Sequence, residues 1–196
     1  MMRKMSIVGL VICLASMAFG QTAAQQKRGE RSDNVVDKVD KLNLLNQILP
    51  LIMTKEQIRK ILPAIERARQ KVRDIEKVES DDLKAIEGKV DAALKDAMGK
   101  DAVPSKALLQ ELAGTFAAMR NRRQLIAEEN AQNVAKVVKE VLNAGQIKTA
   151  ANSINPKLFN PNFKPEEMTQ DDRLELFIRE ILLHPLTYDL LVQMSK

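Results

Sequence analysis

The side chains that most often perform catalysis or hold metals are nearly missing from this chain. Its 196 residues include one histidine, His184, and one cysteine, Cys13. A zinc site needs several imidazole, thiolate or carboxylate ligands, so one chain cannot supply a histidine- or cysteine-rich site. His184 directly precedes Pro185, which favours a role at a helix end. We therefore expect no metal ligands and no cofactor.

Pairs of acidic residues are the other groups with chemical potential. Asp81-Asp82 and Asp171-Asp172 each stand at an expected helix start, where the positive end of the helix dipole stabilises carboxylates. That position accounts for them without general acid–base catalysis. The chain also lacks a glycine-rich phosphate-binding loop and a nucleophile elbow. The sequence thus predicts a protein that is not an enzyme and has no catalytic residues.

The composition indicates an all-α fold. Aromatic residues make up 3% of the chain, and only seven residues are glycine. Strands favour aromatic and β-branched side chains and tight hairpins need glycine, so a β-protein is disfavoured. The abundant Ala, Leu, Lys, Glu, Gln and Arg lose little side-chain entropy in helices. The net charge of +5 is mild, and no basic stripe interleaved with aromatic residues predicts nucleic-acid binding.

The N-terminus has the layout of an export signal. Two basic residues precede an uncharged, mostly apolar run over residues 5–19, which is shorter than the roughly 20 apolar residues of a membrane span. Ala18 and Gly20 then form a signal-peptidase site, and a second site follows Ala24. We expect residues 1–20 to be a signal peptide, with cleavage as late as residue 24. An uncleaved N-terminal anchor is the alternative.

Export would place the mature chain in the periplasm. Cleavage would remove Cys13 and leave no thiol for a disulfide or a nucleophile, and no membrane span. Residues 21–34 are polar and aperiodic, so we expect a flexible linker there.

Apolar periodicity predicts helices along the rest of the chain. The first helix covers residues 35–49 and ends at Pro50. Its apolar residues near one face are Val36, Val39, Leu42, Leu45 and Leu49. The second begins at Thr54 and has an apolar seam with gaps of three and four residues. That seam comprises Ile58, Ile61, Ile65, Ala68, Val72 and Ile75. Pro63 interrupts it and predicts a kink or a restart. Residues 80–99 continue this helix or begin another.

One very long central helix is expected from Ser105 to about Leu142. At about 1.5 Å per residue it would span over 50 Å, which exceeds the width of a globular core for this chain size. We therefore expect an elongated helical hairpin or bundle. Residues 155–196 then form a proline-rich connector and two C-terminal helices. Those helices are apolar enough that they must pack on the bundle, on a second subunit or on a bound protein.

Two of the expected helix starts share a motif. In Met53-Thr54-Lys55-Glu56-Gln57 the Thr54 side chain can accept from the Gln57 N–H, and the Gln57 side chain can reach the Thr54 N–H. Leu142-Asn143-Ala144-Gly145-Gln146 repeats this arrangement with Asn143 and Gln146. In each copy, an apolar residue on either side of the motif can form a hydrophobic staple.

These two helix starts, separated by a long helical hairpin, resemble the LTxxQ repeats of the Spy/CpxP family of periplasmic proteins. The resemblance covers residues 44–152, with Met53 in place of the first Leu and Asn143 in place of the second Thr. It implies a helical domain over residues 35–154 that forms a homodimer. It also implies an ATP-independent chaperone or a stress sensor of the cell envelope. Residues 155–196 lie outside the resemblance.

The resemblance further implies that unfolded envelope proteins, or a regulatory protein partner, bind through mixed basic and apolar contacts. The candidate binding residues are Arg120, Arg122, Arg123, Phe116, Met119, Phe177 and Leu190. A solvated helix surface is the alternative for the basic stretch. Two other functions stay open: a sensor that docks on a membrane signalling partner, and a structural protein that oligomerises through residues 169–194.

Overall fold

The computed structural model describes residues 23–196, with side chains from residue 35 onward. Within this part every regular element is a helix, which confirms the all-α prediction. The predicted signal peptide lies outside the described residues. The chain divides into two units, residues 1–38 and 39–196, and the following description of packing concerns the second.

Helix α1 (Ala23–Ile48) begins twelve residues before the apolar periodicity does. The segment 23–34 is therefore helical and not the irregular linker that its polarity predicted, because Ala, Gln, Lys, Arg and Glu are good helix formers without an apolar face. The buried side of α1 also differs from the prediction. Leu44 and Ile48 are buried, whereas Val39 and Leu42 are exposed. Apolar residues occupy two opposite sides of this helix, and spacing alone selected the wrong one.

A short 3-10 helix, η1 (Leu49–Leu51), follows α1 and leads into a strained residue. Ile52 has φ 47° and ψ 46°, in the left-handed region, and its side chain is 82% exposed. A β-branched residue rarely adopts this conformation because its Cβ crowds the carbonyl oxygen. The left-handed residue ends η1 and turns the chain toward the next helix.

Replacing Ile52 with glycine is expected to stabilise the chain. The left-handed conformation costs an L-residue about 1–2 kcal/mol, and the extra flexibility of unfolded glycine offsets part of the gain. We expect the free energy of unfolding to rise by about 0.5–1 kcal/mol. Urea denaturation followed by circular dichroism would measure it. Asp101 (φ 51°) is the matched control. Because aspartate tolerates this region better, Asp101→Gly should gain less, and equal gains would argue against strain at Ile52.

Helix α2 (Lys55–Lys100) continues without interruption for 46 residues. It passes through Pro63 and through residues 80–82, so neither position restarts the helix. Pro63 lies near the beginning of α2, where its missing N–H removes one backbone hydrogen bond from a helix that is held by many others. A left-handed Asp101 ends α2 by donating its N–H to the Asp96 carbonyl.

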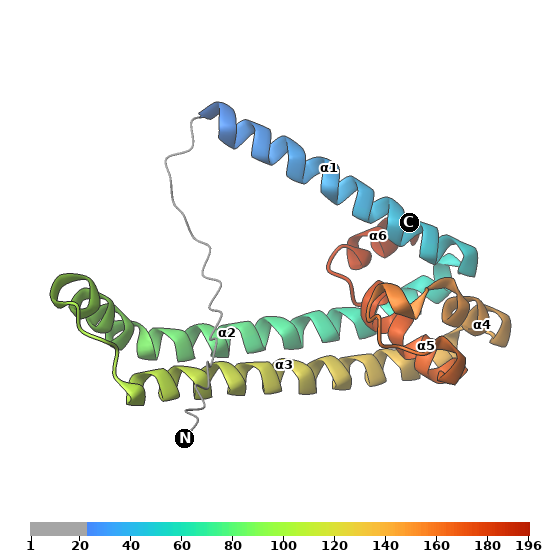
Figure 1. Ribbon diagram of the computed structural model, residues 1–196. Coiled ribbons are helices and arrows are strands. Elements are labelled where there is room, and N and C mark those ends of the chain that lie inside the picture. Colours follow the sequence, from blue (N-terminus) through green and yellow to red (C-terminus); the bar gives the residue numbers. More distant parts are fainter. Residues whose placement is uncertain (1–22) are drawn as a thin grey trace, which may run out of the picture. The chain divides into compact units, whose positions relative to one another are not determined.

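Helix α3 (Lys106–Val141) runs back along α2 and forms the predicted hairpin with it (Figure 1). Ser105 caps it, since its hydroxyl accepts from the Leu108 N–H at 3.2 Å. Helix α4 (Ala144–Ser153) follows after a short turn. The expected long helix and the expected boundaries near Ser105 and Leu142 are therefore confirmed.

The C-terminal segment folds back on one end of the hairpin. Two 3-10 turns, η2 (Pro156–Leu158) and η3 (Pro165–Glu167), form the connector. Helix α5 (Gln170–Phe177) then continues into a π-helical turn over Ile178–Leu182, and α6 (Thr187–Met194) ends the chain. Helix α5 packs on α4 and α3, and α6 packs on α2 (Figure 1).

The hydrophobic core lies at that end alone. In α2 it takes residues 58–68 and in α3 residues 131–138, together with buried side chains of α4, α5 and α6. Beyond it, the part of the hairpin over residues 72–125 has only two buried apolar side chains in the described structure, Ile86 and Met119. We call residues 72–125 the outer hairpin.

Candidate functional site

Both predicted capping boxes are formed. Thr54 Oγ1 accepts from the Gln57 N–H at 3.1 Å, and Gln57 Oε1 accepts from the Thr54 N–H at 2.9 Å. Asn143 Oδ1 accepts from the Gln146 N–H at 2.9 Å, and Gln146 Oε1 accepts from the Asn143 N–H at 3.0 Å. All four motif residues thus satisfy backbone groups that a helix start leaves without partners.

The two motifs also contact each other directly. Gln57 Nε2 donates to Gln146 Oε1 at 2.9 Å, and Gln146 Nε2 donates to Gln57 Oε1 at 3.1 Å. We call these two residues the glutamine pair. Gln57 further donates to the Val141 carbonyl, and Gln146 donates to the Leu51 carbonyl, both at 3.1 Å. Each glutamine therefore caps its own helix and bonds the other glutamine. Each also donates a hydrogen bond to the backbone segment that precedes the other motif.

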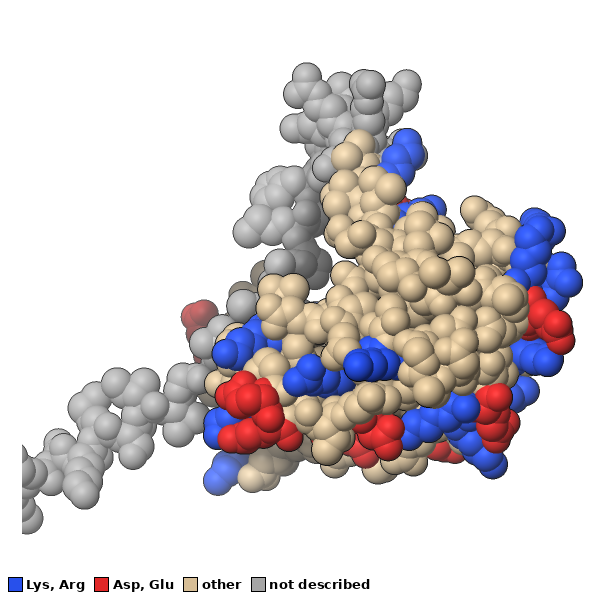
Figure 2. All heavy atoms as spheres, turned by 90° about the vertical axis from the view of Figure 1, so that its right-hand side faces the viewer, with Lys and Arg blue, Asp and Glu red and all other residues tan. Residues whose placement is uncertain are grey.

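The end of the hairpin that carries the motifs exposes an uncharged area beside charged groups. Figure 2 shows uncharged residues over the upper middle of this end, while Lys, Arg, Asp and Glu lie across its lower part and along its outer edges. The side chains of Leu49 and Ile52, which precede the first motif, are 56% and 82% exposed. Apolar exposure is therefore not confined to the outer hairpin.

Ion pairs join α2 and α3 along the outer hairpin and at its border with the core. Arg123 forms a bidentate pair with Glu79, and Arg122 pairs with Asp82. Lys71 pairs with Glu129 at 2.5 Å and Lys89 with Glu111 at 2.6 Å. Arg122 and Arg123, predicted as binding residues, are therefore already engaged in ion pairs within the chain. Their guanidinium groups neutralise acids of the facing helix.

The carboxylate of Glu79 is the most buried charge in this set, since its side chain is only 4% exposed. Hydrogen bonds from Arg123 lower the pKa of Glu79 below its ordinary value of 4.5, with further help from the charges of Arg123 and Arg122. Burial of the carboxylate and the charge of Asp82 oppose this shift. Glu79 therefore stays ionised in the folded chain at mildly acidic pH.

The lowered pKa of Glu79 predicts an acid-dependent loss of stability. Above pH 4.5 its ion pair contributes fully. As the pH falls below 4.5 the unfolded chain binds the proton first, so the free energy of unfolding decreases until folded Glu79 is also protonated. Glu79→Gln should be less stable than the parent at pH 7 and should lose less stability between pH 5 and about pH 2. Urea denaturation along a pH series measures both, and parallel curves would contradict a role for Glu79.

Three predicted binding residues lie inside the protein. Phe177 is fully buried and Leu190 is 8% exposed, because the C-terminal helices pack on the hairpin with their apolar sides. Met119 is 7% exposed on the inner side of the outer hairpin. These three predictions of surface contact are wrong. The apolar pattern of the sequence marks a residue for burial but does not say which partner buries it.

Phe116 and Arg120 do lie on the surface. Phe116 is 46% exposed and Arg120 is exposed, and no described carboxylate forms an ion pair with Arg120. Leu109, 43% exposed, precedes Phe116 by seven residues, or two turns, so it lies on the same side of α3. Arg120 follows Phe116 by four residues on this side. We call Leu109, Phe116 and Arg120 the α3 surface.

Other large apolar side chains are exposed along the outer hairpin. They are Val72, Val78, Leu83, Leu94, Met98, Val103 and Leu125. So many exposed apolar residues on a two-helix hairpin favour contact with another protein.

Asn130 is a structural residue that the sequence analysis did not single out. It is 4% exposed, and its Nδ2 donates to the Ala68 carbonyl of α2 at 3.1 Å. It borders the core, where an unpaired amide would be costly. Two features of the sequence indicate this burial. Asn130 lies seven residues before Val137, and it lies between apolar seam positions.

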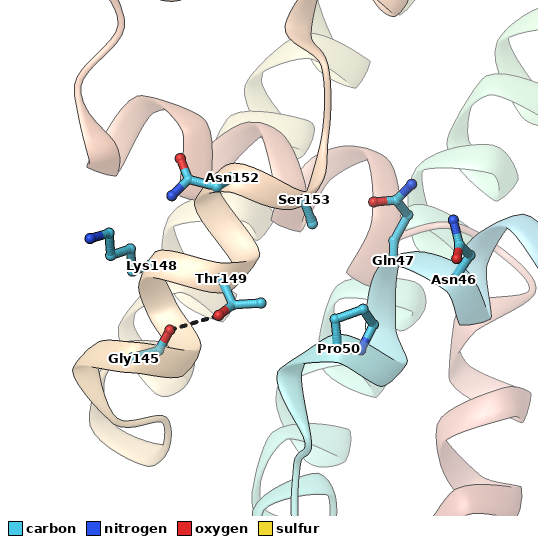
Figure 3. A pocket seen from close by; sticks show the side chains of 8 residues that line it. All are labelled: Asn46, Gln47, Pro50, Gly145, Lys148, Thr149, Asn152 and Ser153. Atoms are coloured by element: carbon cyan, nitrogen blue, oxygen red, sulfur yellow. Dashed lines mark hydrogen bonds between the residues drawn. The ribbon is translucent and has the colours of Figure 1, made fainter.

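A polar groove of about 450 Å³ lies between the end of α1 and α4 (Figure 3). Its lining residues are Asn46, Gln47, Pro50, Gly145, Lys148, Thr149, Asn152 and Ser153. The Thr149 hydroxyl donates to the Gly145 carbonyl at 3.0 Å, which is an ordinary contact within a helix. Lys148 is the only ionisable lining group, so this groove lacks a pair of groups for acid–base catalysis.

Among residues 35–196, no group of three or more His, Cys, Asp or Glu side chains is arranged to hold a metal ion. In the same part of the chain, no helix combines the length and the apolar character needed to cross a membrane.

Comparisons with known proteins leave the resemblance to the Spy/CpxP family as a proposal. No protein-family model matches the chain, and no match was found among curated proteins or solved structures.

Proposed function

We propose that this chain is a periplasmic, ATP-independent holding chaperone of the Spy/CpxP type, which binds unfolded envelope proteins and acts as a homodimer. The glutamine pair is the observation that carries the proposal. General capping boxes would satisfy only their own helices, whereas Gln57 and Gln146 also bond each other across 89 residues of sequence. This direct bond between the two motif glutamines supports the resemblance to a family with two LTxxQ repeats.

The exposed residues of the outer hairpin supply the binding surface. Leu109 and Phe116 offer apolar contacts of moderate size, and Arg120 adds a free positive charge on the same side of α3. Unfolded chains expose apolar side chains among charges of both signs. Electrostatic attraction accelerates the encounter, and several weak apolar contacts then hold the chain reversibly. Neither step needs a nucleotide or a cofactor.

The reason for considering a structural protein that oligomerises through residues 169–194 no longer holds. An oligomerisation arm over residues 169–194 was inferred from its apolar side chains. Those side chains, among them Leu174, Phe177 and Leu191, are buried in the chain's own core. They are therefore not free to bind a second subunit.

Aggregation of a chemically denatured client, followed by light scattering, tests the proposal. The parent chain at equimolar amounts should suppress most of the scattering, and Leu109→Ser with Phe116→Ser should lose at least about half of that suppression. Leu158→Ser is the matched control, because Leu158 is 79% exposed but belongs to the connector. No suppression by the parent chain, or equal suppression by the double variant, would refute the proposed binding surface.

A pull-down from envelope extract separates the chaperone from the regulator. Many partners in small amounts would support client holding, whereas one stoichiometric membrane-bound partner would support a sensor. The same extract tests the location. A tagged chain found in the cytoplasmic fraction would contradict the proposed export.

A further inference from the structure

The turn between α1 and α2 presents three exposed apolar residues. Leu49 and Ile52 are 56% and 82% exposed, and Pro50 between them is exposed as well. The Ile52 N–H donates to the Leu49 carbonyl at 3.0 Å, so one tight turn carries all three. Leu51 is the member of this turn that faces the core, and it is 1% exposed. We call Leu49, Pro50 and Ile52 the apolar turn.

The apolar turn is held in place although its backbone is strained. Gln146 Nε2 donates to the carbonyls of Leu51 and Ile52, at 3.1 and 3.4 Å, and the buried Leu51 side chain anchors the turn in the core. Ile52→Gly would relieve the left-handed strain, yet the chain has a large apolar side chain there that contacts little of the protein. Backbone strain of this kind is typical of functional positions. The strain therefore indicates that the Ile52 side chain contacts something outside the chain.

Two lysines without acidic partners lie beside the apolar turn. Lys55 follows the turn by three residues, and Lys148 lies on α4, which forms the other side of the polar groove (Figure 3). Both lysines are exposed, and within residues 35–196 neither forms an ion pair. Glu56, the acid next to Lys55 in the sequence, pairs with Lys60 instead, at 3.0 Å.

We propose that the apolar turn inserts into the surface of a phospholipid bilayer with anionic headgroups, with Lys55 and Lys148 at the level of the headgroups. The apolar side chains leave water for the boundary of the acyl chains, and each lysine near an anionic surface strengthens binding about fivefold. The segments 49–60 and 141–153 carry four basic residues and one acidic residue, a net charge of +3. The charge of this end of the hairpin is therefore complementary to an anionic bilayer.

The size of the apolar turn favours a bilayer over a protein partner. A stable protein interface buries roughly 800 Å² on each partner around an apolar centre. The apolar turn offers three residues beside a groove with mostly polar lining. A few inserted side chains with neighbouring lysines are enough for weak, reversible attachment to a bilayer. The outer hairpin begins about 30 Å farther along α2, so this attachment leaves it in solvent.

A fluorescent label in the apolar turn tests insertion. In the full chain with Cys13→Ser, Leu49→Cys carries an environment-sensitive dye in place of an apolar side chain. On mixing with vesicles of phosphatidylglycerol and phosphatidylcholine, the dye emission should rise at least about twofold, because the dye leaves water. Met98→Cys is the matched label site, since Met98 is apolar, 86% exposed and about 60 Å away along α2. Both labelled chains keep the apolar run over residues 5–19, so a difference between them reports on the turn.

Ile52→Gly separates insertion from folding. This variant is expected to be more stable than the parent, so a weaker dye response cannot come from unfolding. With the dye at position 49, its equilibrium constant for insertion should fall at least about threefold, because one inserted side chain is lost. An unchanged constant would contradict the role of Ile52. Client holding by the outer hairpin does not depend on the apolar turn, so Ile52→Gly should still suppress aggregation.

Charge reversal tests the lysines. Lys55→Glu with Lys148→Glu should lower the equilibrium constant for insertion at least about tenfold at low salt, since two attractive charges become repulsive. Lys95→Glu with Lys106→Glu is the control, because both side chains are exposed near the far end of the hairpin and the net charge changes equally. The control should change the constant less than about twofold. Equal losses in the two double variants would show that only the net charge matters and would contradict the proposed orientation.

Three further results would overturn the proposal. The first is no response of the dye at position 49 to anionic vesicles, and the second is an equal response at position 98. The third is a response to envelope proteins but not to pure lipid vesicles, which would show that the apolar turn docks on a protein. Each of these results leaves client holding by the outer hairpin to be judged by the aggregation assay alone.

Discussion

Gln57→Ala is expected to lower the free energy of unfolding by about 2–4 kcal/mol. Loss of the cap acceptor accounts for about 1 kcal/mol, and the two hydrogen bonds that Gln57 donates, to Gln146 and to the Val141 carbonyl, add about 0.5–1.5 kcal/mol each. The cost is larger than for an ordinary cap because the Gln146 amide loses a partner at a part-buried position. Urea denaturation followed by circular dichroism would measure it.

The matched control for Gln57→Ala is Gln124→Ala. Gln124 lies on the exposed side of α3 and donates only to Glu128, one turn away, so its removal should change stability by less than about 0.5 kcal/mol. A double-mutant cycle gives the sharper test. Gln57→Ala and Gln146→Ala together should cost at least about 1 kcal/mol less than the sum of the two single changes. Additive costs would show that the two amides do not act as a unit.

Phe177→Ala is expected to have the largest effect of any single substitution considered. Its ring is fully buried among side chains of the C-terminal helices and the hairpin, so its removal leaves a cavity and should cost about 3–5 kcal/mol. The midpoint of thermal unfolding should fall accordingly, and the chain should aggregate more readily when heated. Calorimetry or circular dichroism measures the change.

Phe116→Ala is the counterpart on the surface. Its ring is 46% exposed, so truncation should change the free energy of unfolding by less than about 0.5–1 kcal/mol while weakening client holding. The two phenylalanines thus separate stability from binding. A Phe177→Ala chain that keeps its stability but loses client binding would mean that the C-terminal helices do not pack as described.

Local signals predicted the ends of the helices well. Thr54, Ser105 and Asn143 all cap helices at the expected starts, because a cap depends on hydrogen bonds within three residues of the chain. The contact between the two glutamines was not predictable in the same way. It depends on the path of the whole hairpin between them, and nothing in either motif specifies that path.

The ion pairing of Arg122 and Arg123 was not predicted, although the sequence contained a usable signal. The seam of α2 continues past Ile75 at the same spacing, through Glu79 and Asp82 to Ile86. Acids at these seam positions face Arg122 and Arg123 in the hairpin. Two seams with opposite charges at matching positions predict an ion-paired hairpin. When the sequence of α3 is considered alone, Arg122 and Arg123 have no visible partners and resemble residues that are free to bind.

Burial of the C-terminal helices was open for a different reason. Their apolar residues required a partner, and the sequence did not distinguish the chain's own hairpin from a second subunit. The sixteen-residue connector over residues 154–169, with prolines at 156, 161 and 165, is long enough for either. Whether the C-terminal helices pack on the chain's own hairpin depends on the apolar surface at the core end of that hairpin. That surface exists only once the chain has folded.

Because the hydrophobic core lies at one end of the hairpin, no single unfolding temperature describes the whole molecule. Amide protons near Ile61 and Val134 are shielded by the whole core and should exchange with solvent only when the entire chain opens. Those near Lys89 and Phe116 are secured mainly by contacts between two helices and should exchange by separate, lower-energy openings. The end of the hairpin that holds the core can therefore stay folded while the outer hairpin samples other conformations. The outer hairpin can change its shape without unfolding the core.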